Sequence, residues 1–212
     1  MDLTPKIHPG RMIEAISRML PERGVVIADV GVHMAWAAYY LALRDGQNFR
    51  KPPSYGPMAM GTCNAMGVKC AEPDRTVIAT VGDGCYLMSG FELTTAVQNN
   101  IPVIWVIFND GEYKLIKLSQ LAVYKETALI SFDNPDYVAF AHACGADGYA
   151  VETQHDFEKA LAAALTSGRP TLIDAKISRI DLPHFSENPQ GVLAGIIDRL
   201  KNRDPSRHDI GE

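Results

Sequence analysis

The sequence predicts a doubly wound α/β fold, a mostly parallel sheet with helices on both of its faces. Short apolar runs alternate along the chain with segments of helical periodicity. Two of these runs, residues 77–81 and 103–108, flank a helical segment at residues 91–98, so the three form a βαβ unit and the two strands must be parallel. With 47% hydrophobic residues in a chain of 212, there is enough apolar material to bury such a sheet.

The first third of the chain is predicted to contain two helices and a strand. A helix can start at Pro9, and its apolar stripe ends before Pro21. The β-branched run at residues 25–28 predicts a strand, and the apolar segment 33–43 predicts the second helix. Residues 44–55 are polar and contain two consecutive prolines, so we expect a surface loop there.

The middle of the chain continues the alternation. Residues 58–71 are rich in small residues and methionine, which predicts a buried helix packed closely on the sheet. The strand at 77–81 stops at Gly82-Asp83-Gly84, and the strand at 103–108 stops at Asn109-Asp110-Gly111.

The remaining elements follow the same pattern. Beyond Asp110 we expect helices at residues 113–121, 135–144 and 156–165, a loop or lid at 123–134, and strands at 149–151 and 171–177. Residues 1–180 are expected to form one domain. Residues 181–212 are expected to form a C-terminal extension with a short amphipathic helix at 192–200 and a frayed end.

Composition excludes several classes of protein. The net charge of −5, without a local cluster of lysine and arginine, argues against a nucleic-acid or anionic-membrane partner. The four cysteines form no CxxC pair, which argues against an iron–sulfur cluster or structural zinc and indicates a reducing cytoplasm. We find no apolar signal core and no run long enough to span a membrane, so a cytoplasmic location is expected.

Two strand ends carry the chemistry. The carboxyl ends of parallel strands face a common crevice, so Asp83 and Asp110 are expected to lie side by side although they are far apart in the sequence. Two carboxylates together with exposed carbonyls suit Mg²⁺ or Ca²⁺. The amides of a glycine-rich turn that opens a helix suit a diphosphate. A second strand–glycine–helix junction ends at Gly31 and could flank the same ligand.

These residues resemble a known motif. GDG, then ELTTA, a Pro-Val strand start and Asn-Asp is similar to the thiamine diphosphate motif, and the chain resembles the diphosphate-binding domain of acetolactate synthase-like enzymes and 2-oxo acid decarboxylases. The likeness extends over most of the chain, through residues 8–9, 29–36, 57–69 and 170–177. It implies thiamine diphosphate and Mg²⁺ as cofactors. Asn-Asp instead of Asn-Asn is similar to the catabolic acetolactate synthases, in which the Asp is the second metal ligand.

The resemblance implies a role for individual residues. Mg²⁺ is expected on Asp83, on Asp110 and on the main-chain carbonyl of Glu112. The diphosphate is expected near Gly31, at the amides of Gly82, Gly84 and Cys85, and beside His33 as a hydrogen-bond donor. For each of these the plainer reading, a turn residue or a satisfied buried histidine, remains open.

Three residues are predicted to form the catalytic group. Met58 matches the large apolar residue that props the cofactor in its bent conformation, although Met60 and Met66 lie nearby. Leu115 is expected to contact the cofactor rings. Lys114 stands where many relatives have glycine, and it is either a solvated helix residue or an ammonium that attracts an anionic 2-oxo acid.

The function implied is decarboxylation of a 2-oxo acid, or ligation of the product to a second carbonyl. In such enzymes a separate pyrimidine-binding domain supplies an activating glutamate, and we see no such domain before or after this one. We therefore expect the chain to be inactive alone and to work in a hetero- or homo-oligomer with a pyrimidine-domain subunit. Two alternatives remain open: the diphosphate subunit of a 2-oxo acid:ferredoxin oxidoreductase, and a non-catalytic remnant of a cofactor domain.

Overall fold

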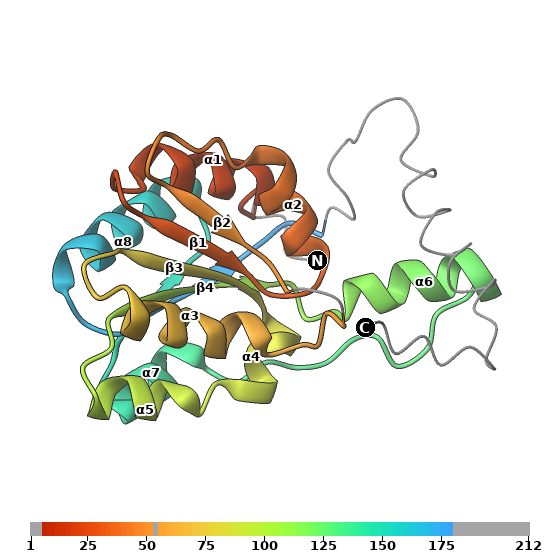
Figure 1. The fold of residues 1–212 in the computed structure, drawn as a ribbon. Coiled ribbons are helices and arrows are strands. Elements are labelled where there is room, and N and C mark those ends of the chain that lie inside the picture. Colours follow the sequence, from red (N-terminus) through yellow and green to blue (C-terminus); the bar gives the residue numbers. More distant parts are fainter. Residues whose placement is uncertain (1–5, 53–54, 180–212) are drawn as a thin grey trace, which may run out of the picture.

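The computed structural model describes residues 6–52 and 55–179, which form a six-stranded sheet with helices on both faces (Figure 1). The strand order is β2-β1-β3-β4-β6-β5, and every pairing is parallel. The predicted doubly wound α/β fold is therefore confirmed. The strands are β1 (Val25–Ala28), β2 (Asn48–Arg50), β3 (Val77–Gly82), β4 (Val103–Asn109), β5 (Asp147–Val151) and β6 (Thr171–Lys176).

The helices form one layer on each side of the sheet (Figure 1). On one face lie α1 (Pro9–Met19), α2 (Val32–Tyr40) and α8 (Gln154–Ser167). On the other face lie α3 (Met60–Ala71), α4 (Asp83–Ser89), α5 (Glu92–Gln98) and α7 (Tyr137–Cys144). The remaining described helix, α6 (Lys114–Tyr124), extends away from the two layers.

The core is divided by the sheet into two apolar clusters. Because successive side chains of a strand point to opposite faces, Val106 belongs to the cluster under α1, α2 and α8, and its neighbour Trp105 belongs to the cluster under α3, α5 and α7. All seven residues of β4 are buried. A strand buried on both faces reads as a continuous apolar run, which is why this strand was predictable.

The direction in which the chain leaves the sheet changes between β1 and β3. After β1 the chain enters α2 on one face, whereas after β3 it enters α4 and α5 on the other face. The two strands are neighbours in the sheet, with Ala28 paired to Thr80. A crevice at the carboxyl end of the sheet is expected where the connections diverge in this way.

Two predictions about local structure were wrong. Residues 44–55 were expected to be a loop, but Asn48–Arg50 form an edge strand that pairs with Val25–Ile27 of β1. This edge strand is three residues long and is not fully buried at any of them, so its side chains show no apolar run. The glycine turn at residues 82–84 was expected to precede a single helix at 91–98, but α4 begins directly at Asp83 and buries Cys85 and Tyr86.

Other boundaries moved by a few residues because of capping. Asp136 accepts hydrogen bonds from the amides of Val138 and Ala139, so α7 starts later than expected. Thr153 accepts from the amide of Asp156, so α8 starts earlier. The helix predicted at residues 192–200 lies outside the described residues.

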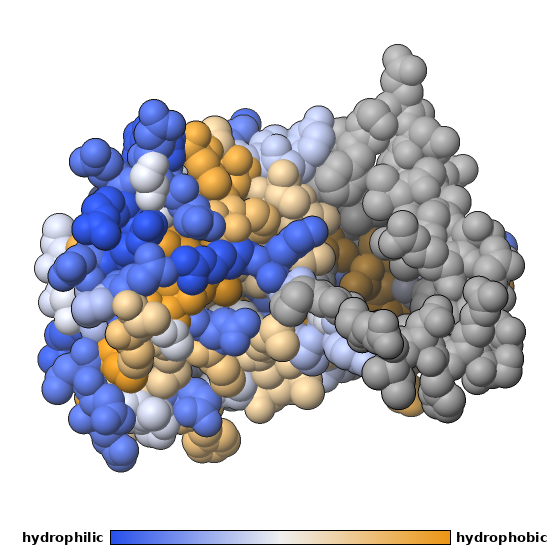
Figure 2. All heavy atoms as spheres, in the orientation of Figure 1, coloured by the Kyte–Doolittle hydropathy of each residue, from blue (hydrophilic) through white to orange (hydrophobic). Residues whose placement is uncertain are grey.

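Figure 2 shows how polar and apolar side chains are distributed over one face of the molecule. Hydrophilic side chains gather at the end opposite α6, and apolar side chains reach the surface nearer the middle of this face. No helix in the described part of the chain has the length and apolar character needed to cross a membrane.

Tyr86 and Tyr137 provide a matched test of the core beneath α4 and α7. Both rings are almost fully buried, and their centroids lie 5.6 Å apart. The Tyr86 hydroxyl has no hydrogen-bond partner, whereas the Tyr137 hydroxyl donates to Oδ1 of Asn134 at 2.8 Å. A buried hydroxyl without a partner costs roughly 1–3 kcal/mol. Tyr86→Phe should therefore leave the free energy of unfolding unchanged or raise it, and Tyr137→Phe should lower it by about 1 kcal/mol.

Urea denaturation of the two variants beside the unaltered chain would measure both changes. Equal destabilisation by the two substitutions would contradict the assignment of partners.

Candidate functional site

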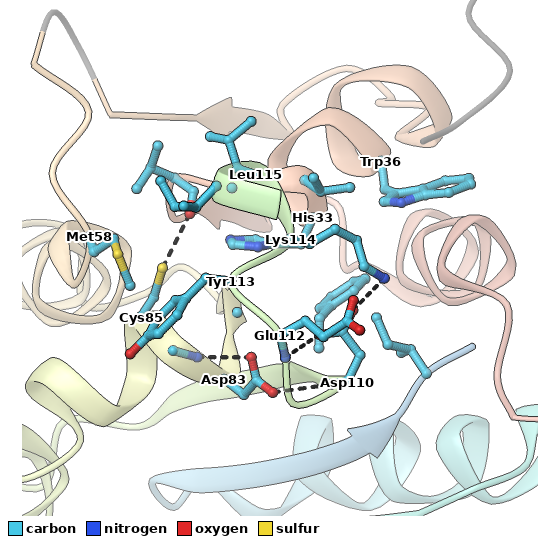
Figure 3. A pocket seen from close by; sticks show the side chains of 18 of the residues that line it. His33, Trp36, Met58, Asp83, Cys85, Asp110, Glu112, Tyr113, Lys114 and Leu115 are labelled. Carbon is cyan, nitrogen blue, oxygen red and sulfur yellow. Dashed lines mark hydrogen bonds and ion pairs between the residues drawn. The ribbon is translucent and has the colours of Figure 1, made fainter. Parts of the chain in front are cut away.

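A cavity lies at the carboxyl end of the sheet, where the junctions after β1, β3 and β4 meet (Figure 3). The close-up shows Met58 and Cys85 on one side of it and Trp36 on the other, with Asp83 and Asp110 at its base. The residues predicted for cofactor, metal and catalysis all line this cavity: Gly31, His33, Met58, Gly82, Asp83, Gly84, Cys85, Asp110, Glu112, Lys114 and Leu115. The structure thus brings together residues that are far apart in the sequence.

Asp83 is the most tightly held of the acidic residues. Its Oδ2 atom accepts hydrogen bonds from the amides of Asp110 (3.1 Å) and Gly111 (2.7 Å) and from Nδ2 of Asn134 (2.8 Å). Its Oδ1 atom accepts from the amide of Gly84 at 2.9 Å. Burial raises the pKa of Asp83, and the donors at Gly111, Asn134 and Gly84 oppose that rise because they stabilise the charged form.

Asp110 lies beside Asp83, as predicted, and its carboxylate is shared between two donors. Oδ1 accepts from the amide of Glu112 at 3.2 Å, and Oδ2 pairs with Nζ of Lys114 at 2.5 Å. The side chains of Asp110 and Lys114 are each only 6% exposed. The ammonium group of Lys114 therefore pairs with a buried carboxylate, and Lys114 is not the solvated helix residue that was one of its two predicted positions. Lys114 also lines the cavity, and its attraction of an anionic 2-oxo acid stays a prediction.

The side chain of Glu112 points away from the two aspartates. Its Oε2 atom pairs with Nζ of Lys117 at 3.1 Å, and its Oε1 atom pairs with Nη1 of Arg179 at 3.5 Å. The main-chain carbonyl of Glu112 accepts the amide of Lys114 at 2.9 Å and keeps a second lone pair. Only the carbonyl of Glu112 is therefore suitable as a ligand beside Asp83 and Asp110.

The oxygen atoms of these residues could supply part of the coordination shell of a hard divalent cation. Within residues 6–52 and 55–179, no group of three His, Cys, Asp or Glu side chains is placed to hold a metal. Two carboxylates and a main-chain carbonyl would supply three oxygen atoms. Mg²⁺ commonly combines one or two carboxylates with water and phosphate oxygens, so this set suits a cation that is bound together with a diphosphate.

Glycine is required where the backbone approaches the cavity. A Cβ atom at Gly84 would lie 2.5 Å from Cε1 of Tyr113. Gly31 has φ +145° and ψ −174°, a conformation essentially restricted to glycine, and a Cβ atom there would lie 2.7 Å from Cε1 of His33. At both positions a neighbouring ring lies where a Cβ atom would be, so only glycine fits there.

His33 is buried and lacks a partner for one ring nitrogen, Nε2. The ring also makes a hydrogen bond to the main chain of Asp29, and burial lowers the pKa of His33 to about 4. The imidazole is therefore neutral near pH 7. With its other nitrogen engaged by Asp29, Nε2 carries the lone pair, so the predicted donation to a diphosphate requires the ring to take up a proton.

Of the three neighbouring methionines, only Met58 lines the cavity. Met60 begins α3, and Met66 packs in the apolar core. Leu115 lines the same cavity from the start of α6. The thiol of Cys85 donates to the carbonyl of Val30 at 3.2 Å, and burial raises its pKa to about 12, so this thiol is not a nucleophile at neutral pH.

Several residues of the site were not identified from the sequence. Trp36 and Tyr113 line the cavity, and Asn134, Tyr137 and Asp174 form a hydrogen-bonded chain behind Asp83. Asp174 left a signal, since it is an acidic residue inside the apolar strand β6. Asn134 left none, because it lies in a segment that has no periodicity.

Comparison with known proteins gives consistent results. Residues 29–175 match the family described as thiamine pyrophosphate enzyme, C-terminal TPP binding domain. The chain is 32% identical over 184 residues to the acetolactate synthase isozyme 2 large subunit of Escherichia coli (strain K12), which covers 82% of this chain and 33% of that protein. It is 29% identical over 178 residues to a sulfoacetaldehyde acetyltransferase of Alcaligenes xylosoxydans xylosoxydans, covering 82% of this chain and 30% of the relative.

A solved structure is similar over the same region. It is a thiamine diphosphate-dependent 4-hydroxybenzoylformate decarboxylase of Rhodococcus jostii RHA1, with a TM-score of 0.77 and 26% sequence identity. The match covers 85% of this chain and 34% of that one. The chain spans about a third of the length of the curated relatives that it matches.

His33 should make stability depend on pH. The unfolded chain binds a proton at this ring near pH 6.5, whereas the folded chain binds it only near pH 4. Folding stability from this group is therefore complete above pH 6.5 and is lost as the pH falls to 4, by up to about 3 kcal/mol. In His33→Gln this part of the pH dependence should disappear.

Urea denaturation between pH 4 and 7 would measure the effect, with His155→Gln as the control, since His155 is exposed on α8. If both variants retained the pH dependence of the unaltered chain, His33 would not be the buried neutral group described here.

Proposed function

The chain belongs to the thiamine pyrophosphate enzyme family, as its C-terminal TPP binding domain, and from this premise we propose that it binds the diphosphate of thiamine diphosphate together with Mg²⁺. One observation carries the proposal. Two carboxylates from neighbouring strand ends, Asp83 and Asp110, and a buried imidazole nitrogen without a partner, on His33, line a single cavity. These groups have the chemistry to bind a cation and the anionic group that accompanies it.

Each part of the cavity is assigned a role in holding the cofactor. Asp83, Asp110 and the carbonyl of Glu112 would provide oxygen ligands for Mg²⁺. The backbone of Gly82 and Gly84, which lines the cavity, would lie against the diphosphate. Protonated His33 would donate from Nε2 to a phosphate oxygen. The cost of charging this buried ring would be offset by the anion.

The rest of the cavity wall is apolar. Met58, Leu115, Trp36 and Ile177 line it, so the rings of the cofactor would meet side chains that exclude water. Met58 would lie against the two rings and favour their bent arrangement. Bound thiamine diphosphate supplies an electron sink for cleavage or formation of a bond next to a carbonyl.

The reaction that we propose is decarboxylation of a small 2-oxo acid, or transfer of the resulting fragment to a second carbonyl. The similar proteins support this class, because they are named as acetolactate synthases, an acetyltransferase and a 2-oxo acid decarboxylase. They favour it over a ferredoxin oxidoreductase subunit. The intact pair of Asp83 and Asp110 in one cavity favours a cofactor-binding protein over a remnant.

We also propose that activity requires a pyrimidine-binding domain in addition to these 212 residues. The relatives are about three times as long as the matched region, which supports a contribution from other domains or from a partner chain. An active oligomer would then place a glutamate of the pyrimidine-binding domain beside the cavity described here.

Substitution of the aspartates tests the proposed cofactor site. Asp83→Ala and Asp110→Ala should each abolish Mg²⁺-dependent binding of thiamine diphosphate, because each removes an oxygen ligand. Trp36 lines the cavity, so tryptophan fluorescence during a cofactor titration, with Mg²⁺ or with EDTA, would report binding.

Asp74→Ala is the matched control for these substitutions. Asp74 is exposed and precedes β3, so it lies at the amino ends of the strands, opposite the end that carries the cavity. Unchanged cofactor affinity in both site variants would refute the proposed role of the aspartates.

Lys114 should weaken the binding of a divalent cation in the absence of cofactor. Its ammonium group occupies Oδ2 of Asp110, one of the proposed ligand groups. Lys114→Met should therefore tighten binding of Mn²⁺ alone, on the order of fivefold, which corresponds to about 1 kcal/mol. Titration of Mn²⁺ followed by electron paramagnetic resonance would measure this affinity.

Lys117→Met removes from the same helix a positive charge that pairs with the carboxylate of Glu112, and it is the control for general electrostatics. A tightening of equal size in both variants would show that the contact with Asp110 has no specific effect.

A further inference from the structure

A network of buried and partly buried hydrogen bonds lies behind Asp83 and crosses the carboxyl ends of three strands. Asn134 donates from Nδ2 to Oδ2 of Asp83 at 2.8 Å and to Oδ1 of Asn109 at 2.9 Å. Asn109 donates from Nδ2 to Oδ1 of Asp174 at 2.7 Å, and Oδ2 of Asp174 pairs with Nζ of Lys176 at 2.9 Å. These hydrogen bonds therefore connect the ends of β3, β4 and β6 through Asn134, which belongs to no strand.

The orientation of the Asn134 amide is fixed at both of its ends. Its Oδ1 atom accepts the hydroxyl of Tyr137 at 2.8 Å, and a carbonyl oxygen can only accept. Its Nδ2 atom faces the carboxylate of Asp83, which when ionised can only accept as well. Rotation of the amide by half a turn would break these bonds and place an oxygen atom against a carboxylate. Tyr137 thus holds the NH₂ group of Asn134 toward Asp83.

This orientation distinguishes the two oxygen atoms of Asp83. Oδ2 receives donors from Asp110, Gly111 and Asn134, which leaves no lone pair in the carboxylate plane for another partner. Oδ1 receives only the amide of Gly84 and keeps a lone pair. A cation at Asp83 would therefore be bound by Oδ1.

We propose that Asn134 is the positioning residue of the cation site, because its NH₂ group, together with the amides of Asp110 and Gly111, holds Oδ2 of Asp83 and so leaves Oδ1 as the ligand atom. This inference rests on the proposed function, since it assumes that Asp83 binds a cation. Asn134 itself is not one of the residues that line the cavity. Partners that orient a metal ligand in this way commonly change metal affinity by 10- to 100-fold when they are removed.

Asn134 also connects the cation site to the segment that follows α6. The amide of Tyr113 donates to the carbonyl of Ile130 at 2.8 Å, and the amide of Phe132 donates to the carbonyl of Gly111 at 3.1 Å. The rings of Tyr113 and Phe132 pack with their centroids 4.5 Å apart. Residues 130–134 are therefore docked on the loop that carries Asp110 and Glu112. Binding of a cation at Asp83 should then stabilise the docked segment through Asn134.

The test compares Asn134→Ala with the unaltered chain, prepared together with any partner that co-purifies. Mn²⁺ affinity is measured by electron paramagnetic resonance, with and without thiamine diphosphate. We expect Asn134→Ala to weaken Mn²⁺ binding about tenfold. Tyr137→Phe, which keeps the amide of Asn134 but frees its orientation, should weaken it less. Asn99→Ala and Tyr86→Phe are the controls and should bind Mn²⁺ normally, since Asn99 is an exposed residue at the C-terminal end of α5 and the Tyr86 hydroxyl has no partner.

A second measurement distinguishes positioning from a general loss of structure. Amide hydrogen exchange in residues 128–134 should slow when Mn²⁺ and thiamine diphosphate bind to the unaltered chain. In Asn134→Ala at saturating Mn²⁺ this slowing should be lost, whereas exchange in β4 should not change. Normal Mn²⁺ affinity in Asn134→Ala, with binding lost in Asp83→Ala, would overturn this inference and leave the proposed function intact. Normal affinity in Asp83→Ala would overturn both.

Discussion

The carboxylate of Asp83 must be satisfied in a buried position, and the arrangement of the site depends on how this is done. Only 2% of the residue is exposed, and burial of an ionised carboxylate is costly unless it is hydrogen-bonded. The donors come from three segments: the start of α4, the loop after β4 and Asn134 beyond α6. Each donor fixes the position of its own segment. The hydrogen bonds to this one carboxylate therefore hold the three segments together at the cavity.

A second buried aspartate, Asp29, also holds neighbouring segments together by accepting backbone hydrogen bonds. Asp29, at the end of β1, accepts the amide of Val30 at 2.7 Å and that of Gly61 at 3.0 Å, and burial raises its pKa. A Cβ atom at Gly61 would lie 2.7 Å from Asp29, so the first turn of α3 can approach only because this residue is glycine. Ala59 adopts φ 76°, a left-handed conformation that is unusual for alanine. The backbone beside Met58 is thus held by tertiary contacts.

The charges around the cavity are balanced in pairs. Asp110 is neutralised by Lys114, and Glu112 is neutralised by Lys117 and Arg179. His33 is neutral because of its burial. Asp83, like Asp29, is stabilised by dipoles without a cationic side chain, and it therefore retains an electrostatic preference for a cation. This distribution explains how a protein with a net charge of −5 could accept an anionic cofactor, since the anion would arrive with its own metal and find few unpaired carboxylates.

The sequence alone determined the order and type of most elements, the parallel sheet and the meeting of Asp83 with Asp110. These features follow from local periodicity and from the rule that the carboxyl ends of parallel strands lie on the same side of the sheet, facing one crevice. The strand that contains Asp174 was also predicted from the sequence, but the hydrogen bond that Asp174 accepts from Asn109 was not.

Only the tertiary structure decided that Asn134 contacts Asp83, that Lys114 pairs with Asp110 and that Met58 rather than Met60 lines the cavity. It also decided that Asn48–Arg50 are a strand. The physical reason is that side-chain pairs between distant segments, such as the 51 positions that separate Asp83 and Asn134, depend on the final packing and leave no periodic trace in either segment.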